Sequence, residues 1–288
     1  MKKLTTFIFL SMTTLNAMAQ GGSEIYLFDL KVSKDNVTIT NAKNITTRIG
    51  YDNQPSFHPE QPILYYTSAD TAGLTDIVAF NYKTGEAKKF TTTPDREYSP
   101  TVTPDKKYIS CIIQRADGKQ DLGKYPMEGG APILIVDALT VGYHAWADQG
   151  NLILFVLGEQ NTLRWFSVED KKDIVLAENI GRSLHVIPGS NDLSFVQKTK
   201  DGAWLIRKIE AKDRNISTLT ETLPGREDLT WTPDGRIIMS DGEKLFYFQP
   251  GNKASWKEIP TNSSLPLKGI TRLSVNKKGD KIAIVIAE

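Results

Sequence analysis

Few side chains in this sequence belong to motifs of known catalytic chemistry. The 288 residues include three histidines, His58, His144 and His185, and none of them pair at a metal-ligand spacing. The sequence contains no G-x-S-x-G nucleophile motif, no H-E-x-x-H zinc motif and no EF-hand loop. The glycines of "MEGGAP" fit a hairpin rather than a strand-to-helix phosphate loop. These observations favour recognition over catalysis.

Residues suited to recognition stand just before six short apolar segments. The candidate ligand-binding residues are Asp52, Glu97, Tyr98, Tyr143, His144, Arg182, His185, Arg226, Asp228 and Arg272. Arginine offers a forked donor and tyrosine a large rigid surface, and both are typical of binding sites. These positions vary between copies while the adjacent turn and strand positions stay similar. A binding site on an axis has no reason to repeat, although ordinary solvated loops would vary in the same way.

These residues are positioned by six copies of one sequence pattern. In each copy a short polar segment, which we call the lead-in, is followed by a short apolar stretch, a tight turn and an apolar run. The turn proline, or the residue in its place, is Pro59, Pro104, Asp148, Pro188, Pro233 and Lys277. A period of about 40 to 45 residues with only short strands between turns predicts a propeller with one four-stranded blade per period. In "LTWTPDGRIIMSDGEKLFYF", Pro-Asp-Gly and Asp-Gly mark two reversals, and the aromatic residue before the first is expected to pack between blades.

The two ends of the chain predict how the ring closes. The last copy stops after its second strand, "KIAIVIAE", while "EIYLFDLKV" and "VTITNAK" near the N-terminus look like third and fourth strands. Joining these strands completes one blade and leaves no free sheet edge. We therefore predict an all-β fold, a six-bladed β-propeller formed as a single domain by residues 20–288.

The first 19 residues predict a signal peptide. Lys2 and Lys3 precede the apolar run "LTTFIFLSMTTL", and Ala17 to Ala19 form a small-x-small cleavage site. An uncleaved anchor is the alternative, but the run is shorter than the roughly 20 residues of a membrane span. No integral membrane segment is expected after cleavage. A bacterial protein that is periplasmic or secreted follows from this pattern.

The single cysteine and the charge balance narrow the choice of partners. Cys111 is the only cysteine, so no intramolecular disulfide is possible, and its place in "YISCII" predicts a buried, inert thiol. No cysteine follows the signal peptide, so no lipid anchor is expected. The chain has 35 basic and 34 acidic residues, a balance that predicts neither nucleic acid nor an anionic membrane as partner. We expect a monomer.

Several phrases of the repeat resemble a known family. "SFHPE", "TVTPDKKYI" and "WTPDGRI", with "TGEAKKFTTTPDREYSP" and "EGGAPILI", resemble the WD-like repeats of the TolB-type propeller family over roughly residues 22–288. Related blades occur in the propellers of dipeptidyl peptidases and prolyl oligopeptidases. TolB-type proteins contact a peptidoglycan-associated lipoprotein, so the resemblance implies a binding propeller of the bacterial envelope. The first predicted strand begins close to Gln20, so the N-terminal α/β domain of those proteins is not expected here, and only the fold is carried over.

Two function classes remain open. The first is a non-catalytic exported binding or scaffold propeller, without a cofactor, that recognises a protein, a peptide or an envelope glycan at the mouth of the central channel. The alternative is a metal-dependent lactonase, lyase or hydrolase in the channel. A divalent metal would then be held by His144 and His185, which begin neighbouring inner strands, with Asp52, Glu97 and Asp228 as further candidates. A carbohydrate-binding sensor is a third possibility. For the histidines, a solvated or hydrogen-bonded structural role is the expectation over metal binding, and His58 is expected to form a hydrogen bond within its own turn.

Overall fold

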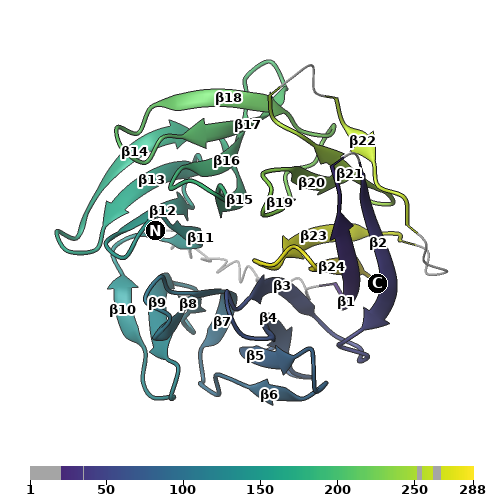
Figure 1. Ribbon diagram of the computed structural model, residues 1–288. Helices are drawn as coiled ribbons and strands as arrows, with labels where there is room; N and C mark the ends of the chain where they lie inside the picture. The colour runs from purple at the N-terminus through teal and green to yellow at the C-terminus, as the bar shows by residue number, and fades with distance from the viewer. Residues whose placement is uncertain (1–20, 35, 252–254, 262–266) are drawn as a thin grey trace, which may run out of the picture.

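The computed structural model describes residues 21–34, 36–251, 255–261 and 267–288. These residues form six four-stranded antiparallel sheets, and this part of the chain contains no helix. Figure 1 shows the sheets as the blades of a ring, with six inner strands around a common centre. The predicted all-β fold, a six-bladed β-propeller, is confirmed.

The first three blades follow one another along the chain, each from the axis outward. Blade 1 contains β3 (Asp52–Phe57), β4 (Ile63–Ala69), β5 (Thr75–Asn81) and β6 (Ala87–Lys89). Blade 2 contains β7 (Arg96–Val102), β8 (Tyr108–Gln114), β9 (Gln120–Pro126) and β10 (Ile133–Val136). Blade 3 contains β11 (Val141–Trp146), β12 (Asn151–Val156), β13 (Thr162–Ser167) and β14 (Lys172–Glu178).

The last three blades complete the ring, and the sixth combines both ends of the chain. Blade 4 contains β15 (Ile180–Val186), β16 (Leu193–Lys198), β17 (Trp204–Ile209) and β18 (Ile216–Glu221). Blade 5 contains β19 (Leu229–Trp231), β20 (Ile237–Ser240), β21 (Leu245–Phe248) and β22 (Lys257–Glu258). Blade 6 contains β23 (Ile270–Val275), β24 (Lys281–Ala287), β1 (Ser23–Val32) and β2 (Val37–Asn44).

Ring closure occurs through the predicted pairing of the chain ends. Strand β1 lies antiparallel to β24, with Ser23 opposite Ala287 and Asp29 opposite Lys281. The Ser23 amide donates to the Gly50 carbonyl at 2.9 Å, and the Ser23 hydroxyl donates to the carbonyl of Asp52 at the same distance. These bonds join the closing blade to blade 1, while the pairing of β1 with β24 joins the two ends of the chain within the closing blade.

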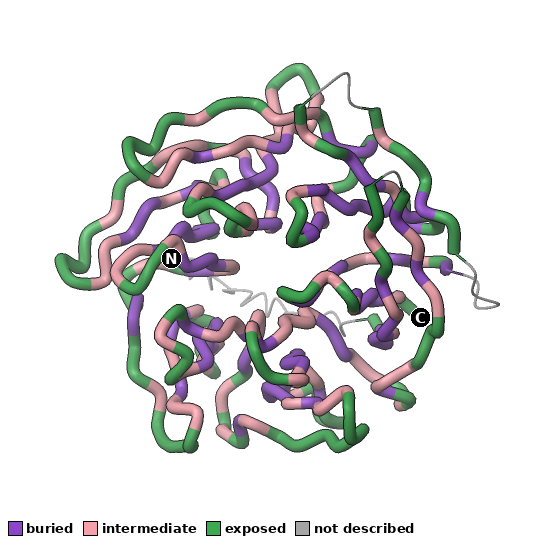
Figure 2. The backbone as a smooth tube through the Cα atoms, viewed as in Figure 1, coloured by how far each residue is buried: buried purple, intermediate pink, exposed green. Residues whose placement is uncertain are grey.

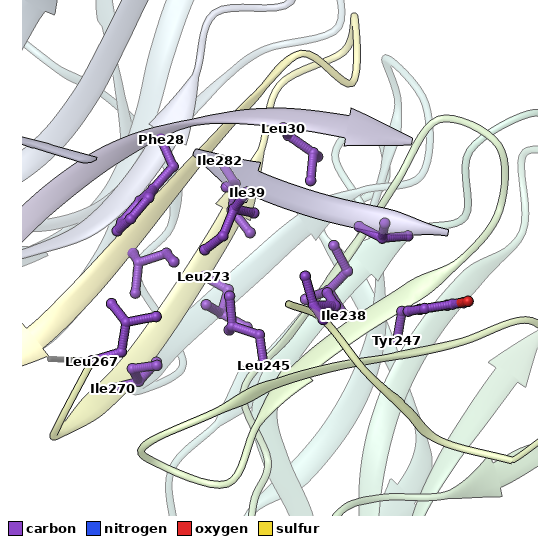
Figure 3. Close-up of a cluster of buried hydrophobic side chains, with 13 residues drawn as sticks. Phe28, Leu30, Ile39, Ile238, Leu245, Tyr247, Leu267, Ile270, Leu273 and Ile282 are labelled. Carbon is purple, nitrogen blue, oxygen red and sulfur yellow. The ribbon is translucent and has the colours of Figure 1, made fainter. Parts of the chain in front are cut away.

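The closing blade shares a buried apolar core with blade 5. Figure 3 shows Phe28, Leu30 and Ile39 of β1 and β2 beside Ile238 and Leu245 of blade 5, within a cluster of buried apolar side chains. Burying one such side chain contributes about 1.5–3 kcal/mol. The closure is therefore stabilised by packing as well as by strand pairing.

The repeated Pro-Asp-Gly turn has a simple local cause. Pro233 fixes its own φ, and Gly235 adopts a φ of 84°, a conformation that other residues rarely take. The Thr232 amide donates to the Arg236 carbonyl at 2.8 Å, and the Thr232 hydroxyl donates to Asp234 at 2.5 Å. In blade 5 the turn thus reverses the chain after the inner strand, with the polar groups of Thr232 hydrogen-bonded.

The aromatic residue before the turn packs between blades, as predicted. The Trp231 indole donates to the hydroxyl of Ser194 in blade 4, and the Trp146 indole donates to Ser110 in blade 2, both at 2.9 Å. Figure 2 shows that the buried chain lies mainly in the inner and middle strands, whereas the outer strands and loops are largely exposed. Cys111 is fully buried in this layer, and burial raises the pKa of its thiol well above the usual range.

The predicted signal peptide, residues 1–19, lies outside the described residues. In the part of the chain that the structure does describe, no helical segment has the length and apolar character needed to span a bilayer.

Candidate functional site

A cavity of about 560 Å³ lies on the propeller axis. All six inner strands or their flanking residues contribute to its wall, including Gln54, Thr101, Tyr143, Arg182, Asp228 and Arg272. Such convergence is a consequence of the fold, since each blade presents the edge of its first strand to the axis. A concave site of this size with a few polar groups is the usual form of a ligand pocket.

The cavity has two ends, which we call the lead-in end and the turn end. At the lead-in end are residues at or just before the start of the inner strands, such as Arg182 near the start of β15 and Asp228 just before β19. At the turn end are the residues that follow those strands, including Pro59, Pro104 and the exposed Lys106 and Lys277. Because every blade has the same strand order, equivalent ends of the six inner strands meet at the same end of the channel.

At the lead-in end, the same position of the repeat contributes a residue to the cavity wall in all six blades. Counting back five residues from each turn position identifies Gln54, Ser99, Tyr143, Ser183, Asp228 and Arg272, and all six line the cavity. The strand register is interrupted close to this position in five blades, and Gln54 and Ser99 have φ angles of 57° and 55°. A bulge turns a side chain away from its regular direction. The local irregularity therefore brings these six side chains to the cavity wall.

A hydrogen bond crosses the channel at this level. The Arg272 guanidinium donates to the Tyr143 phenolic oxygen at 2.7 Å, although the two residues are 129 positions apart. Tyr143 belongs to β11 and Arg272 to β23, which face each other across the centre of the ring in Figure 1. The same guanidinium lies 5.1 Å from the centre of the Tyr143 ring. This pair forms a bar across the channel.

A second charged pair lies beside the bar. Arg182 donates to both carboxylate oxygens of Asp228, at 3.0 and 2.6 Å, in a forked geometry. Burial alone would lower the pKa of Arg182, but the hydrogen bonds and charge of Asp228 raise it overall. An Arg272 nitrogen is 3.7 Å from Asp228, which is beyond hydrogen-bond distance. Both hydrogen bonds to Asp228 in this group therefore come from Arg182.

The cavity wall has an excess of positive charge. Among the described residues, its charged side chains are Arg182, Arg272, Lys106 and Lys277 against the single carboxylate of Asp228. Lys106 also forms an ion pair with Glu60 at the turn end. In a protein of net charge +1, this concentration of cations is local, and a cleft lined by one sign of charge attracts ligands of the other sign.

The two channel histidines are neutral and held by serines. His144 Nε2 lies 2.7 Å from the Ser110 hydroxyl, and His185 Nε2 lies 2.9 Å from that of Ser183. Burial lowers the pKa of His144 to about 3 and that of His185 to about 4. The Nδ1 atom of His144 is buried and has no hydrogen-bond partner. His58, by contrast, accepts two backbone N–H bonds within its own turn, so its predicted structural role is confirmed.

Asp52 and Glu97 are not at the cavity, in contrast to the placement predicted from the repeat. Both are fully buried between blades. Glu97 accepts hydrogen bonds from Thr91, Thr93 and Tyr125, and Asp52 is paired with Arg48 at 2.8 Å. Burial raises the pKa of both carboxyl groups, against the opposing effect of these partners. They join one blade to the next.

Tyr98 and Arg226 are also absent from the cavity wall. Tyr98 is half-buried and packs against the apolar cluster of blades 2 and 3. Arg226 is exposed and donates to the carbonyl of Asp241 in a neighbouring hairpin. The structure therefore brings together six of the ten candidates, which are Tyr143, His144, Arg182, His185, Asp228 and Arg272.

The sequence-based selection omitted several residues of the wall. Ser99 lines the cavity, and its buried hydroxyl has no hydrogen-bond partner. Its position in the repeat is the same as that of Tyr143 and Arg272, so the alignment of copies could have identified it. Lys106 and Lys277 follow the inner strands rather than preceding them, and a search confined to lead-in residues could not include them.

No group of three or more histidine, cysteine, aspartate or glutamate side chains in the described chain is arranged to hold a metal ion. His144 and His185 each have a serine partner at Nε2 rather than a shared carboxylate. The divalent-metal hypothesis therefore finds no donor set among these residues.

Comparison with solved structures identifies the fold. A structure assigned as TolB from Agrobacterium tumefaciens is similar over 93% of this chain and 99% of its own, with a TM-score of 0.70 and 13% sequence identity. TolB from Acinetobacter baumannii is similar over 92% of this chain and 63% of its own, with a TM-score of 0.59 and 11% identity. The predicted TolB-type propeller fold is thus confirmed.

A hydrolase is also similar in structure. A puromycin-hydrolyzing peptidase from Mycobacterium tuberculosis matches 88% of this chain at a TM-score of 0.58 and 13% identity. The present chain spans only 48% of that peptidase and less than two thirds of the Acinetobacter TolB. No protein-family model and no curated protein sequence matches the chain.

Proposed function

We propose that the protein is a binding propeller that takes a peptide segment of a partner protein into its central cavity. The observation that carries the proposal is the single cavity wall to which all six blades contribute, with four basic side chains and one carboxylate. A peptide fits this arrangement because the cavity lies along the inner strands. The inner strands that surround it are mostly six or seven residues long, which corresponds to about 20 Å of extended chain.

The chemistry of the wall supports recognition. Arginine and tyrosine provide forked donors and rigid contact surfaces, and both recur in the energetic centres of interfaces. Hydroxyl side chains on the inner strands, including Ser56, Thr101, Thr230 and Ser274, leave room on the axis while offering hydrogen bonds. The two TolB structures that this chain resembles also favour a binding role as a hypothesis.

Hydrolysis has less support. The similarity to the puromycin-hydrolyzing peptidase covers less than half of that protein, and no cluster of three or more histidine, cysteine or acidic side chains suited to a metal ion is found among the described residues. The enzyme alternative therefore rests on no specific feature of the cavity.

We further propose that the protein is exported, with cleavage after Ala19 releasing residues 20–288 as one propeller domain. The proposal rests on the basic start, the apolar run and the small residues of the N-terminal sequence. N-terminal sequencing of the protein recovered from a periplasmic extract would test it. Recovery in the cytoplasm with Met1 intact would contradict it.

Filling the cavity tests the binding function. Ser274 is half-buried on the cavity wall, so Ser274→Trp places an indole on the axis. Ser217 is exposed on the outer strand β18, so Ser217→Trp is a matched control that adds the same side chain elsewhere. Binding of a fluorescent degenerate hexapeptide library should be lost in Ser274→Trp and retained in Ser217→Trp. Equal binding by both folded variants would place the peptide site outside the cavity and refute the proposal.

A further inference from the structure

We infer that the bound peptide ends in the cavity and that its C-terminal carboxylate is held on the axis by Arg272. The inference rests on the binding function proposed above. It goes further by assigning a chemical group of the ligand to a particular side chain and a direction to the bound chain.

Arg272 has more donors than the structure satisfies. A guanidinium carries five N–H donors. Among the described residues, Arg272 makes one hydrogen bond, to Tyr143, and has one longer ion pair, 3.7 Å from Asp228; its side chain is only 15% exposed. A half-paired guanidinium in so enclosed a place is costly unless an acceptor joins it. The cavity is the space from which such an acceptor can come, since Arg272 lines it.

Two hydroxyl groups in the same wall are also without acceptors. The Tyr143 oxygen accepts from Arg272, but no acceptor for its own O–H proton is found within the described chain. The buried Ser99 hydroxyl has no partner at all, and it occupies the same position of the repeat as Tyr143. Arg272 and Tyr143 therefore offer donors at the lead-in end of the cavity, whereas the Ser99 hydroxyl is enclosed by protein atoms.

Among the described residues, the wall offers no negatively charged acceptor that is still free. Asp228 is its only carboxylate among the described residues, and both oxygens of Asp228 accept hydrogen bonds from Arg182. His144 is buried and neutral, and its Nε2 is occupied by Ser110. A ligand that brings an oxygen acceptor with negative charge would complement both the donors and the excess of positive charge.

A carboxylate fits this complement better than a phosphate does. Its two oxygens match the forked N–H groups of one arginine, and its single charge matches one guanidinium left without a full partner. A phosphate carries more charge and is usually bound by several cations or by a helix N-terminus. The second arginine, Arg182, is already occupied by Asp228, and the described chain contains no helix.

The Arg272–Tyr143 pair across the channel favours binding of the C-terminal carboxylate of a peptide over binding of an acidic side chain. Arg272 and Tyr143 join opposite sides of the ring, so a peptide that enters from the turn end meets them and stops. The exposed Lys106 and Lys277 lie at that entrance and attract a negatively charged chain end. The carboxylate at the end of a peptide is its free C-terminus, so this is the group that we infer reaches Arg272.

Three peptide libraries test the inference on the full chain. All are N-terminally fluorescein-labelled degenerate hexapeptides. The first has a free C-terminus and no Asp or Glu, the second has an amidated C-terminus and one Glu, and the third has an amidated C-terminus and no acid. Wild-type protein should bind the first library at least tenfold more tightly than the third. Arg272→Gln should abolish this preference, and Arg272→Lys should restore part of it. Arg226→Gln, a matched change of an exposed arginine outside the cavity, should leave it intact.

Each result has a distinct meaning. Tight binding of the second library as well, with the same dependence on Arg272, would support a carboxylate anchor but place it on a side chain. Equal affinity for all three libraries in wild type and Arg272→Gln would overturn the carboxylate inference while leaving the binding function in place. Binding of no library, with inorganic phosphate instead quenching the protein's fluorescence through Arg272, would overturn both. Circular dichroism should show that the variants keep the wild-type fold.

Discussion

The junctions between blades 1, 2 and 6 and the axis of the ring use charged residues in opposite ways. At the junctions, the carboxylates of Asp52 and Glu97 are fully buried, and Glu97 accepts bonds from Thr91, Thr93 and Tyr125. On the axis, Arg272 has one hydrogen-bonding partner and faces a cavity. The residues come from similar positions of one repeat, so the difference lies in what surrounds them.

This contrast separates stability from binding. Removing a buried carboxylate that several donors share destabilises the fold, because those donors are left unsatisfied. A charge with spare donors beside an open cavity contributes less to the fold and is available to a ligand. Variants at the two regions should therefore affect different measurements.

The largest effect on stability is expected from Phe28→Ala in the closing blade. Phe28 is fully buried in the cluster of Figure 3, so its truncation leaves a cavity and should reduce the free energy of unfolding by about 3–5 kcal/mol. Ile49→Ala is the matched control, because Ile49 is 94% exposed and its loss should change stability by less than about 0.5 kcal/mol. Urea unfolding measures both, and similar values for the two would contradict the packing described at the ring closure.

Glu97→Ala should have the next largest effect. It leaves Thr91, Thr93 and Tyr125 without their shared acceptor, and we expect a loss of about 2–4 kcal/mol in unfolding free energy. Glu86→Ala removes an exposed carboxylate whose partner is Lys88 and should cost less than about 0.5 kcal/mol. Below its melting temperature, Glu97→Ala should still bind the free-acid peptide library. Loss of that binding in a folded sample would place Glu97 in the site after all.

The two regions should also respond to pH with opposite signs. The folded pKa of His144, about 3, lies below its ordinary value of 6.5, so the unfolded chain binds a proton more readily. The stability that depends on neutral His144 is complete above pH 6.5 and is lost as pH falls, by about 1.4 kcal/mol per pH unit. Asp52 and Glu97 have raised pKa values in the folded protein, so their contribution is greatest at low pH and declines as pH rises through those values.

Replacing His144 with leucine isolates its part of this dependence. Leucine occupies the equivalent position in three other blades, as Leu184, Leu229 and Leu273, and Ser110 keeps its bond from Trp146. His144→Leu should change stability at pH 7 by less than about 1 kcal/mol and flatten its decline between pH 6.5 and pH 4.5. Urea midpoints measured across that range give the slope. An unchanged slope would mean that His144 can take up a proton while the protein remains folded.

The smallest effect on stability is expected from Arg272→Gln. The Arg182–Asp228 pair remains, and the excess of positive charge decreases, so the unfolding free energy should change by less than about 1 kcal/mol. Peptide binding should nevertheless be lost, as described above. A destabilisation as large as that of Glu97→Ala would show that Arg272 supports the fold, and the distinction between junction and axis would fail.

Much of the architecture could be predicted because it depends on spacing. Each blade must reverse the chain with the same tight turns, so Pro233, Gly235 and their equivalents recur at a regular period. The pairing of β1 with β24 follows from the incomplete copies at the two chain ends. These features are local or repeated, and a local conformational requirement leaves a pattern in the sequence.

The candidate site could be predicted only in part. The repeat identified the level at which Tyr143, Arg182, Asp228 and Arg272 meet, but it assigned Asp52 and Glu97 to the same surface. Whether such a residue faces the axis or a blade junction depends on bulges of one residue and on partners from other strands. Glu97 is held by Tyr125 of β9, which the position of Glu97 in the repeat does not indicate.

By itself, the sequence determined an all-β ring of six blades, its closure by the two chain ends, and the residue types available at its axis. The tertiary structure alone decided that Arg272 forms a hydrogen bond with Tyr143 across the channel and that Asp228 accepts hydrogen bonds from Arg182. It also decided that the Ser99 hydroxyl has no hydrogen-bond partner. The physical reason is that closing the ring brings side chains that are 46 and 129 residues apart within hydrogen-bond distance. Periodicity along the chain specifies each blade, but the contacts across the axis depend on how all six are placed around it.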